Sequence, residues 1–172
     1  MTNKGFKIET ERLILRAHCM DDIDRCVLMN QNPEVAEFVG YGMTFTRESM
    51  KKLLEETTFA DYKKYGYGRL AVVDKTNNLF IGFSGLKYIP ELDEVELGYR
   101  FFREYWGKGI ATEAGKASIQ FGKEHLGLKR IIGLVNPDNI ASIRVLEKLG
   151  FQYEKNVLYI DEEADLYALE IK

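Results

Sequence analysis

The stretch "ELGYRFFREYWGKGIATEAG", Glu96–Gly115, decides the fold. Its first half predicts a strand, and its second half predicts a helix that begins at Ile110. Between them lies a turn with two glycines and a lysine. The first N–H groups of a helix have no internal partner and carry the positive end of its dipole, while glycines allow close approach of a ligand. The turn therefore predicts a site for an anion, and phosphate fits it well.

Two common phosphate loops do not match this turn. A nucleoside-triphosphate loop would need glycine at the position of Phe102, and Ser or Thr at that of Gly109. A dinucleotide fingerprint would need a third glycine where Thr112 stands, and it usually follows the first parallel strand. From the turn alone, a glycine-rich connection that binds no ligand stays open.

The rest of the chain predicts an α/β fold with a mixed sheet, helices on both faces, and one domain over residues 1–172. Three consecutive strands between 68 and 102 have short connections and predict an antiparallel meander. The strand–helix–strand unit over 94–135 predicts a parallel pair with a right-handed crossover. Helices are expected at Asp21–Asn30, Glu34–Val39, Arg47–Tyr65, Ile110–His125 and Asn139–Leu149, and strands at Arg12–Ala17, Gly68–Asp74, Leu79–Tyr88, Glu94–Phe102, Arg130–Val135, Phe151–Leu158 and Asp165–Ile171.

Composition excludes several classes of protein. The net charge of −3 argues against a nucleic-acid partner, and no apolar run reaches the roughly 18 residues that a membrane span needs. The first residues contain no apolar signal core, so a cytoplasmic location is expected. Cys19 and Cys26 are expected to be reduced thiols, and no histidine stands at ligand spacing, so no metal site is predicted. The oligomeric state, monomer or homodimer, is not determined by the sequence.

Three motifs together resemble one family. The stretches "YWGKGIATEA" and "VNPDNIASIRVLEKLGF" (Val135–Phe151) resemble the GNAT superfamily of acetyl-CoA-dependent N-acetyltransferases, at that family's spacing. The opening "ETERLILRAHCMDDID" is similar to the subgroup related to the ribosomal-protein N-terminal acetyltransferases, the RimJ/RimL type. The resemblance spans about Ile8 to Ile171. It implies the GNAT fold, in which the parallel pair splays at the cofactor site, with acetyl-CoA as co-substrate and no metal.

The resemblance also implies which residues hold coenzyme A. Backbone amides of the glycine turn would cradle the pyrophosphate, and strand residues Tyr99, Arg100 and Phe101 would run beside the pantetheine arm. Asn139 is similar to the family's asparagine at the mouth of the next helix, a role compatible with a plain N-cap. Trp106 replaces the family's usual Arg or Gln, which matters little where backbone groups hold the phosphate. The turn residues are Trp106, Gly107, Lys108, Gly109, Ile110, Ala111 and Thr112.

Acetyl transfer to an amine needs a neutral amine, donors for the oxyanion and help for the departing thiolate. Glu96 is the candidate base, because it matches the family's strand carboxylate and lies on the strand face opposite Leu97 and Tyr99. A solvated strand glutamate is the alternative. The N–H of Leu97 or Gly98 is a candidate oxyanion donor, where the strand splays from its parallel neighbour.

Ser142 is the candidate for the thiolate. Many family members have a tyrosine four residues further along this helix, where Leu146 stands here and cannot donate a hydrogen bond. The RimJ/RimL subgroup has a serine at the position of Ser142. The alternative is a helix serine that bonds back to its own turn.

Two functions follow from these observations. The first is an N-acetyltransferase acting on a primary amine, which could be a protein N-terminus, a polyamine, an amino acid or an aminoglycoside-like drug. Its acceptor pocket is expected from the helical region 21–65 and the last strands. The second is a non-catalytic acyl-CoA-binding or sensing module of the same fold, which would need neither Glu96 nor Ser142.

Overall fold

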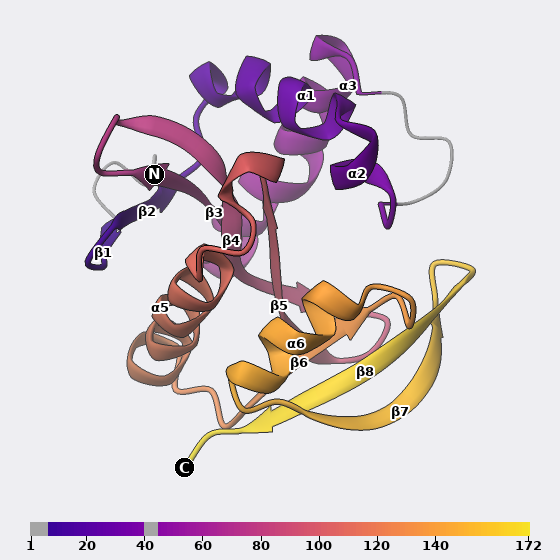
Figure 1. The fold of residues 1–172 in the computed structure, drawn as a ribbon. Helices are drawn as coiled ribbons and strands as arrows, with labels where there is room; N and C mark the ends of the chain where they lie inside the picture. The colour runs from indigo at the N-terminus through magenta and orange to yellow at the C-terminus, as the bar shows by residue number, and fades with distance from the viewer. Residues whose placement is uncertain (1–6, 40–44) are drawn as a thin grey trace.

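The computed structural model describes residues 7–39 and 45–172 (Figure 1). Two segments lie outside the described residues. Residues 1–6 belong to the N-terminal stretch from which a cytoplasmic location is expected, and residues 40–44 belong to the predicted acceptor region. The strands are β1 (Lys7–Glu9), β2 (Leu13–Ala17), β3 (Arg69–Asp74), β4 (Leu79–Ile89), β5 (Glu94–Phe101), β6 (Arg130–Val135), β7 (Gln152–Tyr159) and β8 (Glu162–Glu170). The α-helices are α1 (Ile23–Gln31), α2 (Pro33–Ala36), α3 (Arg47–Leu53), α4 (Phe59–Tyr65), α5 (Ile110–His125) and α6 (Ile140–Lys148).

The strands form one mixed sheet in the order β1-β2-β3-β4-β5-β6-β8-β7. Strands β3, β4 and β5 are antiparallel neighbours, whereas β5 and β6 are parallel. The meander, the crossover through α5 and the mixed sheet are therefore confirmed. In Figure 1 the β6–β8 part swings away from the part that contains β1–β4, and β5 lies at the division.

Helices cover both faces of the sheet, as predicted. On one face, α5 and α6 pack over apolar side chains that include Leu70, Leu86 and Ile131. On the other, α1, α2 and α3 enclose a second cluster that includes Met29, Met50 and Ala71 of β3. Because β5 alternates, Leu97 lies in the first core while Glu96 belongs to the opposite face. The fold thus gives the two sides of β5 different surroundings.

Besides short 3-10 turns at Met20–Asp22 and Arg103–Tyr105, the structure differs from the expected element order at two places. A short strand, β1, pairs with β2 at the sheet edge; its few residues are too short for a periodic pattern. The helix expected over Arg47–Tyr65 is interrupted by a π-helical segment at Leu54–Thr58. Its ends were predicted correctly: the Thr46 side chain accepts from the Ser49 N–H, and Gly66 ends it with φ of 80°.

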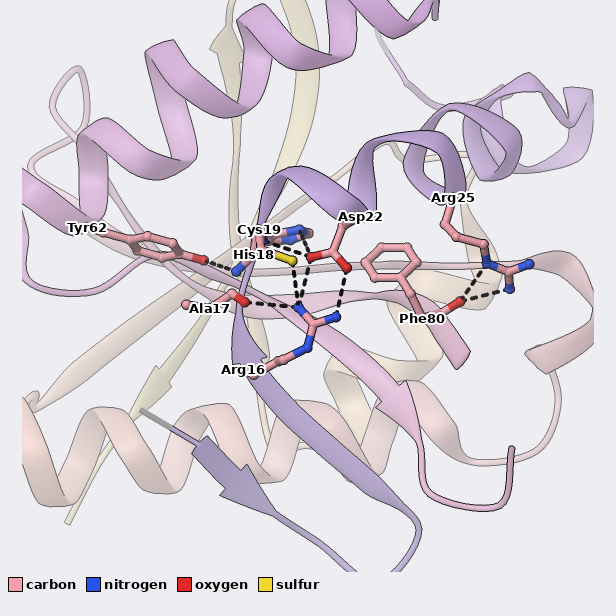
Figure 2. Close-up of polar contacts among 8 residues, drawn as sticks. All are labelled: Arg16, Ala17, His18, Cys19, Asp22, Arg25, Tyr62 and Phe80. Atoms are coloured by element: carbon pink, nitrogen blue, oxygen red, sulfur yellow. Dashed lines mark hydrogen bonds and ion pairs between the residues drawn. The ribbon is translucent and has the colours of Figure 1, made fainter. Parts of the chain in front are cut away.

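A buried polar cluster fixes α1 and α4 to the sheet (Figure 2). Arg16 of β2 donates to both carboxylate oxygens of Asp22, at 2.8 and 2.7 Å, and Asp22 also accepts from the Cys19 N–H. Tyr62 of α4 accepts from the His18 N–H at 3.1 Å and donates to the Arg69 carbonyl. This cluster locates β3 and Arg69 relative to the helical layer.

Candidate functional site

The glycine turn forms an open helix start. Gly107 and Gly109 have φ of 71° and 75°, in the left-handed region where glycine is favoured, and α5 begins at Ile110. No described side chain caps α5, and a Cβ at Gly107 would meet no atom within 4 Å. The first amides of this 16-residue helix therefore have no side-chain cap among the described residues. Such a helix start is suited to an anion, as the sequence predicts.

The turn is secured by the segment before β2. Glu113, in the first turn of α5, accepts from the Thr10 hydroxyl at 2.6 Å and from Nε of Arg12 at 2.6 Å. Arg12 Nη1 donates to the Lys108 carbonyl at 2.9 Å, while Nη2 lies 3.5 Å from the position a Cβ would take at Gly109. Arg12 thus brings a positive charge to the start of α5. These contacts hold the Glu113 pKa below its usual range, although burial opposes the effect.

The parallel strands β5 and β6 separate at the expected place. Their pairing joins Glu96 to Ile132, and beyond this pair β5 has register partners on β4 alone, from Leu97 to Phe101. The separation therefore begins beside Leu97 and Gly98, the candidate oxyanion donors. It lies between the start of α5 and that of α6 in Figure 1.

Glu96 is ion-paired rather than solvated. Its Oε2 accepts from Arg69 Nη2 at 2.6 Å, and its side chain is 13% exposed. Arg69 Nη1 also donates to the Gly85 carbonyl at 2.7 Å and to the Glu96 carbonyl at 3.3 Å. The guanidinium therefore bonds to both the carboxylate and the backbone of Glu96, which fixes the direction of the carboxylate.

Glycines make this pair possible. Arg69 starts on β3, opposite Gly85 of β4, which in turn is opposite Gly98 of β5. A Cβ at Gly98 would lie 2.4 Å from the guanidinium carbon of Arg69, far inside contact distance. Arg69 can cross β4 and reach Glu96 because neither glycine has a side chain in its path.

Tyr99 and Ser142 meet on the opposite face of β5. The Tyr99 hydroxyl donates to the Ser142 carbonyl at 3.0 Å, and the two hydroxyl oxygens are also 3.0 Å apart. Burial raises the Tyr99 pKa to about 12, with a smaller opposing effect from the bond to Ser142. The Ser142 hydroxyl thus has its partner on β5, beside the gap between β5 and β6 (the strand gap), rather than within its own helical turn.

Asn139 and Leu146 have structural roles at α6. The Asn139 side chain accepts from the Ser142 N–H at 3.1 Å, so the N-cap reading is confirmed. Leu146 is 2% exposed and lies against Gly133, where a Cβ would be 2.7 Å from a Leu146 methyl. Leu146, at the position where the resemblance implies a tyrosine in many family members, therefore serves core packing.

The remaining predicted cofactor residues, Trp106, Phe101 and Arg100, have different surroundings. Trp106 donates from its indole N–H to the Phe101 carbonyl at 3.0 Å, which ties the turn to the end of β5. The Phe101 side chain is buried in the core. Arg100 points to the opposite face, where it donates to Asn30 of α1 at 2.6 Å.

Three parts of the predicted site have separate places, whereas Arg100 and the Phe101 side chain lie elsewhere and Asn139 caps α6. The turn Trp106–Thr112, the Tyr99–Ser142 pair and Glu96 each have a distinct place around the strand gap. Arg12 and Arg69 were missed by sequence reasoning. A glycine within a strand, Gly98, was a usable signal for close approach of another group, whereas nothing local in the sequence singles out Arg12.

The described residues lack two features of other classes of protein. No helix there has the length and apolar character needed to cross a membrane. No group of three His, Cys, Asp or Glu side chains within 7–39 and 45–172 is arranged to hold a metal ion.

Comparisons with known proteins agree with this geometry. The chain is 34% identical over 147 residues to "Uncharacterized N-acetyltransferase p20" of Bacillus licheniformis, covering 84% of this chain and 82% of that protein. It is 31% identical to "Uncharacterized protein YkkB" of Bacillus subtilis, covering 90% of each chain. The crystal structure of ribosomal-protein-S5-alanine acetyltransferase from Vibrio fischeri superposes with a TM-score of 0.78 and 26% identity, covering 96% of each chain. The family described as "Acetyltransferase (GNAT) domain" matches residues 12–152, and this chain belongs to that family.

Proposed function

We infer that this chain transfers the acetyl group of acetyl-CoA to a primary amine, by direct attack in a ternary complex. The amine would be a protein N-terminus or a small molecule. The observation that carries this proposal is the separation of β5 from β6 after the Glu96–Ile132 pair, between the open start of α5 and Ser142. Likeness to the Vibrio fischeri enzyme supports assignment to the RimJ/RimL-type subgroup.

Each group has a part in the proposed reaction. Acetyl-CoA would supply an activated acetyl group, whose C–S bond breaks as the N–C bond to the amine forms. The amides at the start of α5 and the Arg12 guanidinium bind its phosphates. Glu96, held by Arg69, accepts one of the two protons that the ammonium group loses, directly or through water, and the second proton leaves on the departing sulfur, so that coenzyme A is released as a thiol. The Ser142 hydroxyl, joined to Tyr99, donates a hydrogen bond to the departing sulfur.

One observation favours a second function. The Glu96 carboxylate is already engaged by Arg69, and a fully paired carboxylate would suit a non-catalytic acyl-CoA-binding module. In such a module the ion pair would be purely structural. A cytoplasmic location and a monomer or homodimer remain expectations from the sequence.

Thiol release from acetyl-CoA with a panel of amines separates these functions. The panel contains peptides with varied first residues, amino acids, spermidine and an aminoglycoside. An acetyltransferase releases thiol with at least one class of amine, and Glu96→Gln lowers turnover by about 10²–10⁴-fold while coenzyme A affinity stays constant. Tight coenzyme binding with no thiol release from any amine would establish the second function.

A further inference from the structure

Arg100 is a cation without an anionic partner among the described residues. Its Nη1 donates to the neutral side chain of Asn30 at 2.6 Å, and its guanidinium carbon lies 5.4 Å from the Phe83 ring centroid. None of the ion pairs within 7–39 and 45–172 includes Arg100. The remaining residues, 1–6 and 40–44, contain no Asp or Glu in the sequence. The chain therefore supplies no side-chain carboxylate for this guanidinium.

The surroundings make this charge unfavourable. Burial, together with a smaller effect from the neighbouring positive charge of Arg69, lowers the Arg100 pKa to about 10. The group nevertheless stays protonated at neutral pH. The nearby Cys26 thiol remains neutral, because burial raises its pKa to about 12. A partly buried cation in an apolar setting has a cost that a bound anion would offset.

The charge is next to the proposed reaction point. Arg100 and Gly98 are alternate residues on one face of β5, about 7 Å apart along the strand. Arg69 lies across Gly98 and is neutralised by Glu96. Arg100 therefore adds a positive charge without a paired carboxylate to this face, beside the place where β5 leaves β6. Since an Arg guanidinium matches a carboxylate with two parallel N–H groups, one carboxylate would balance the charge.

We propose that Arg100 binds the carboxylate of the amine acceptor, so that the substrate class is small amino acids rather than polyamines. This inference rests on the proposed function and narrows its acceptor. The acceptor's amine would face Glu96 and the strand gap, and its carboxylate would lie against Arg100. A phosphate dianion has two negative charges and Arg100 has one positive charge. A carboxylate, with one negative charge, is therefore the better match.

Matched acceptors test this inference on the full chain. Thiol release from acetyl-CoA is measured with the proteinogenic L-amino acids, with their carboxamides and with spermidine. The carboxamide has the less basic amine, so chemistry alone favours it over the acid. We expect kcat/KM for at least one amino acid to be about tenfold or more higher than kcat/KM for its carboxamide. A difference of this size is what one good hydrogen-bonded charge pair contributes. Equal rates for acid and carboxamide, or a preference for spermidine, would overturn it.

Variants then locate the effect. Arg100→Met lowers kcat/KM for the acid by about tenfold or more and changes the carboxamide less than about twofold. Arg100→Lys retains part of the preference. Lys123→Met, in the exposed last turn of α5 and outside the region expected to form the acceptor pocket, is the control for loss of a surface cation and keeps the wild-type ratio. If Arg100→Met does not fold, the ratio of kcat/KM for the acid to that for the carboxamide, measured on wild type and on Arg100→Lys, still tests the inference.

A binding measurement separates this inference from the proposed function. In the presence of coenzyme A, N-acetyl-L-amino acids should raise the thermal midpoint of wild type, and the corresponding N-acetyl amides should not. If no amine causes thiol release but N-acetyl amino acids still raise the thermal midpoint more than the amides do, the proposed function is refuted and the carboxylate site is supported. Thiol release with amides or spermidine, with no difference in binding, would refute the carboxylate site alone.

Discussion

Arg69 and Glu96 form an ion pair across an intervening strand, with Nη2 and Oε2 2.6 Å apart. Two further bonds from Arg69 Nη1 go to backbone carbonyls on β4 and β5. The pair is therefore part of the sheet rather than a surface contact, and it sets the direction of the carboxylate. In the proposed reaction, Arg69 already orients the carboxylate that receives the ammonium group. The Glu96 side chain therefore loses less conformational freedom when the acceptor binds.

Gly98→Ala should disable this orientation. The new Cβ would take the place of the Arg69 guanidinium, so Arg69 must leave Glu96, and turnover should fall by about tenfold or more. Steady-state kinetics with a reactive amine measure this, with coenzyme A affinity as the control. Arg69→Ala should have a similar effect, and the double variant should be no worse than either single one, because both remove the same contact. Additive losses would show that Gly98 acts independently of Arg69.

Ser142→Ala and Tyr99→Phe should slow turnover to a similar extent. The two hydroxyls are joined, so loss of either leaves the other without its orienting partner. A lost hydrogen bond of about 1 kcal/mol predicts a roughly fivefold lower kcat, with KM for the amine little changed. The kcat of both variants and of the double variant is the measurement. Wild-type kcat in Ser142→Ala would show that the serine only supports α6.

Long elements with strong local signals were predictable from the sequence. The helix Ile110–His125 has the predicted bounds because the left-handed Gly109 precedes it, and Asn139 caps α6 as its residue type suggested. The parallel pair followed from the strand–helix–strand order alone, since a crossover through a helix imposes it. These features depend on neighbours in sequence or on connection length.

The contacts that define the candidate site depend on register between distant strands. Arg69 reaches Glu96 only because Gly85 and Gly98 stand opposite one another across β4 and β5. The pairing of Arg12 with Glu113 joins residues 101 positions apart. The pattern of apolar residues specifies which face a side chain occupies, but not which partner it meets across the sheet. This is why Glu96 was predicted as a site residue and its partner was not.

Arg12→Met should weaken binding of coenzyme A. The variant removes the positive charge beside Gly109 and the bond to the Lys108 carbonyl, both at the proposed phosphate site. We expect a dissociation constant about fivefold higher, and a weaker dependence on salt, since one charged contact near a helix start contributes about 1 kcal/mol. Calorimetry at two salt concentrations measures both. Lys7→Met, which loses an exposed pair with Glu9 in the same hairpin, is the control. Equal losses in both variants would indicate a general effect on the hairpin.

His18 should make stability depend on pH. Its ring is buried, its Nδ1 lies 3.6 Å from Asp22 Oδ2, and burial lowers its pKa from 6.5 to about 4 despite the nearby carboxylate (Figure 2). Arg16, which binds Asp22, also opposes a second positive charge here. The unfolded chain therefore binds a proton between pH 6.5 and 4 that the folded chain does not, so stability decreases as pH falls through this window.

The expected loss is up to about 2 kcal/mol in the free energy of unfolding between pH 7 and pH 5. The lowered pKa of Asp22 acts at more acidic pH, below its usual value of 3.8, and does not contribute in this range. Urea unfolding at the two pH values measures the loss, and His18→Gln should reduce it to near zero, even though the variant is less stable at pH 7. His125→Gln, at the other histidine, should keep the wild-type loss. If His18→Gln kept that loss as well, a proton taken up elsewhere would be responsible, and the buried imidazole would not set the acid limit of the fold.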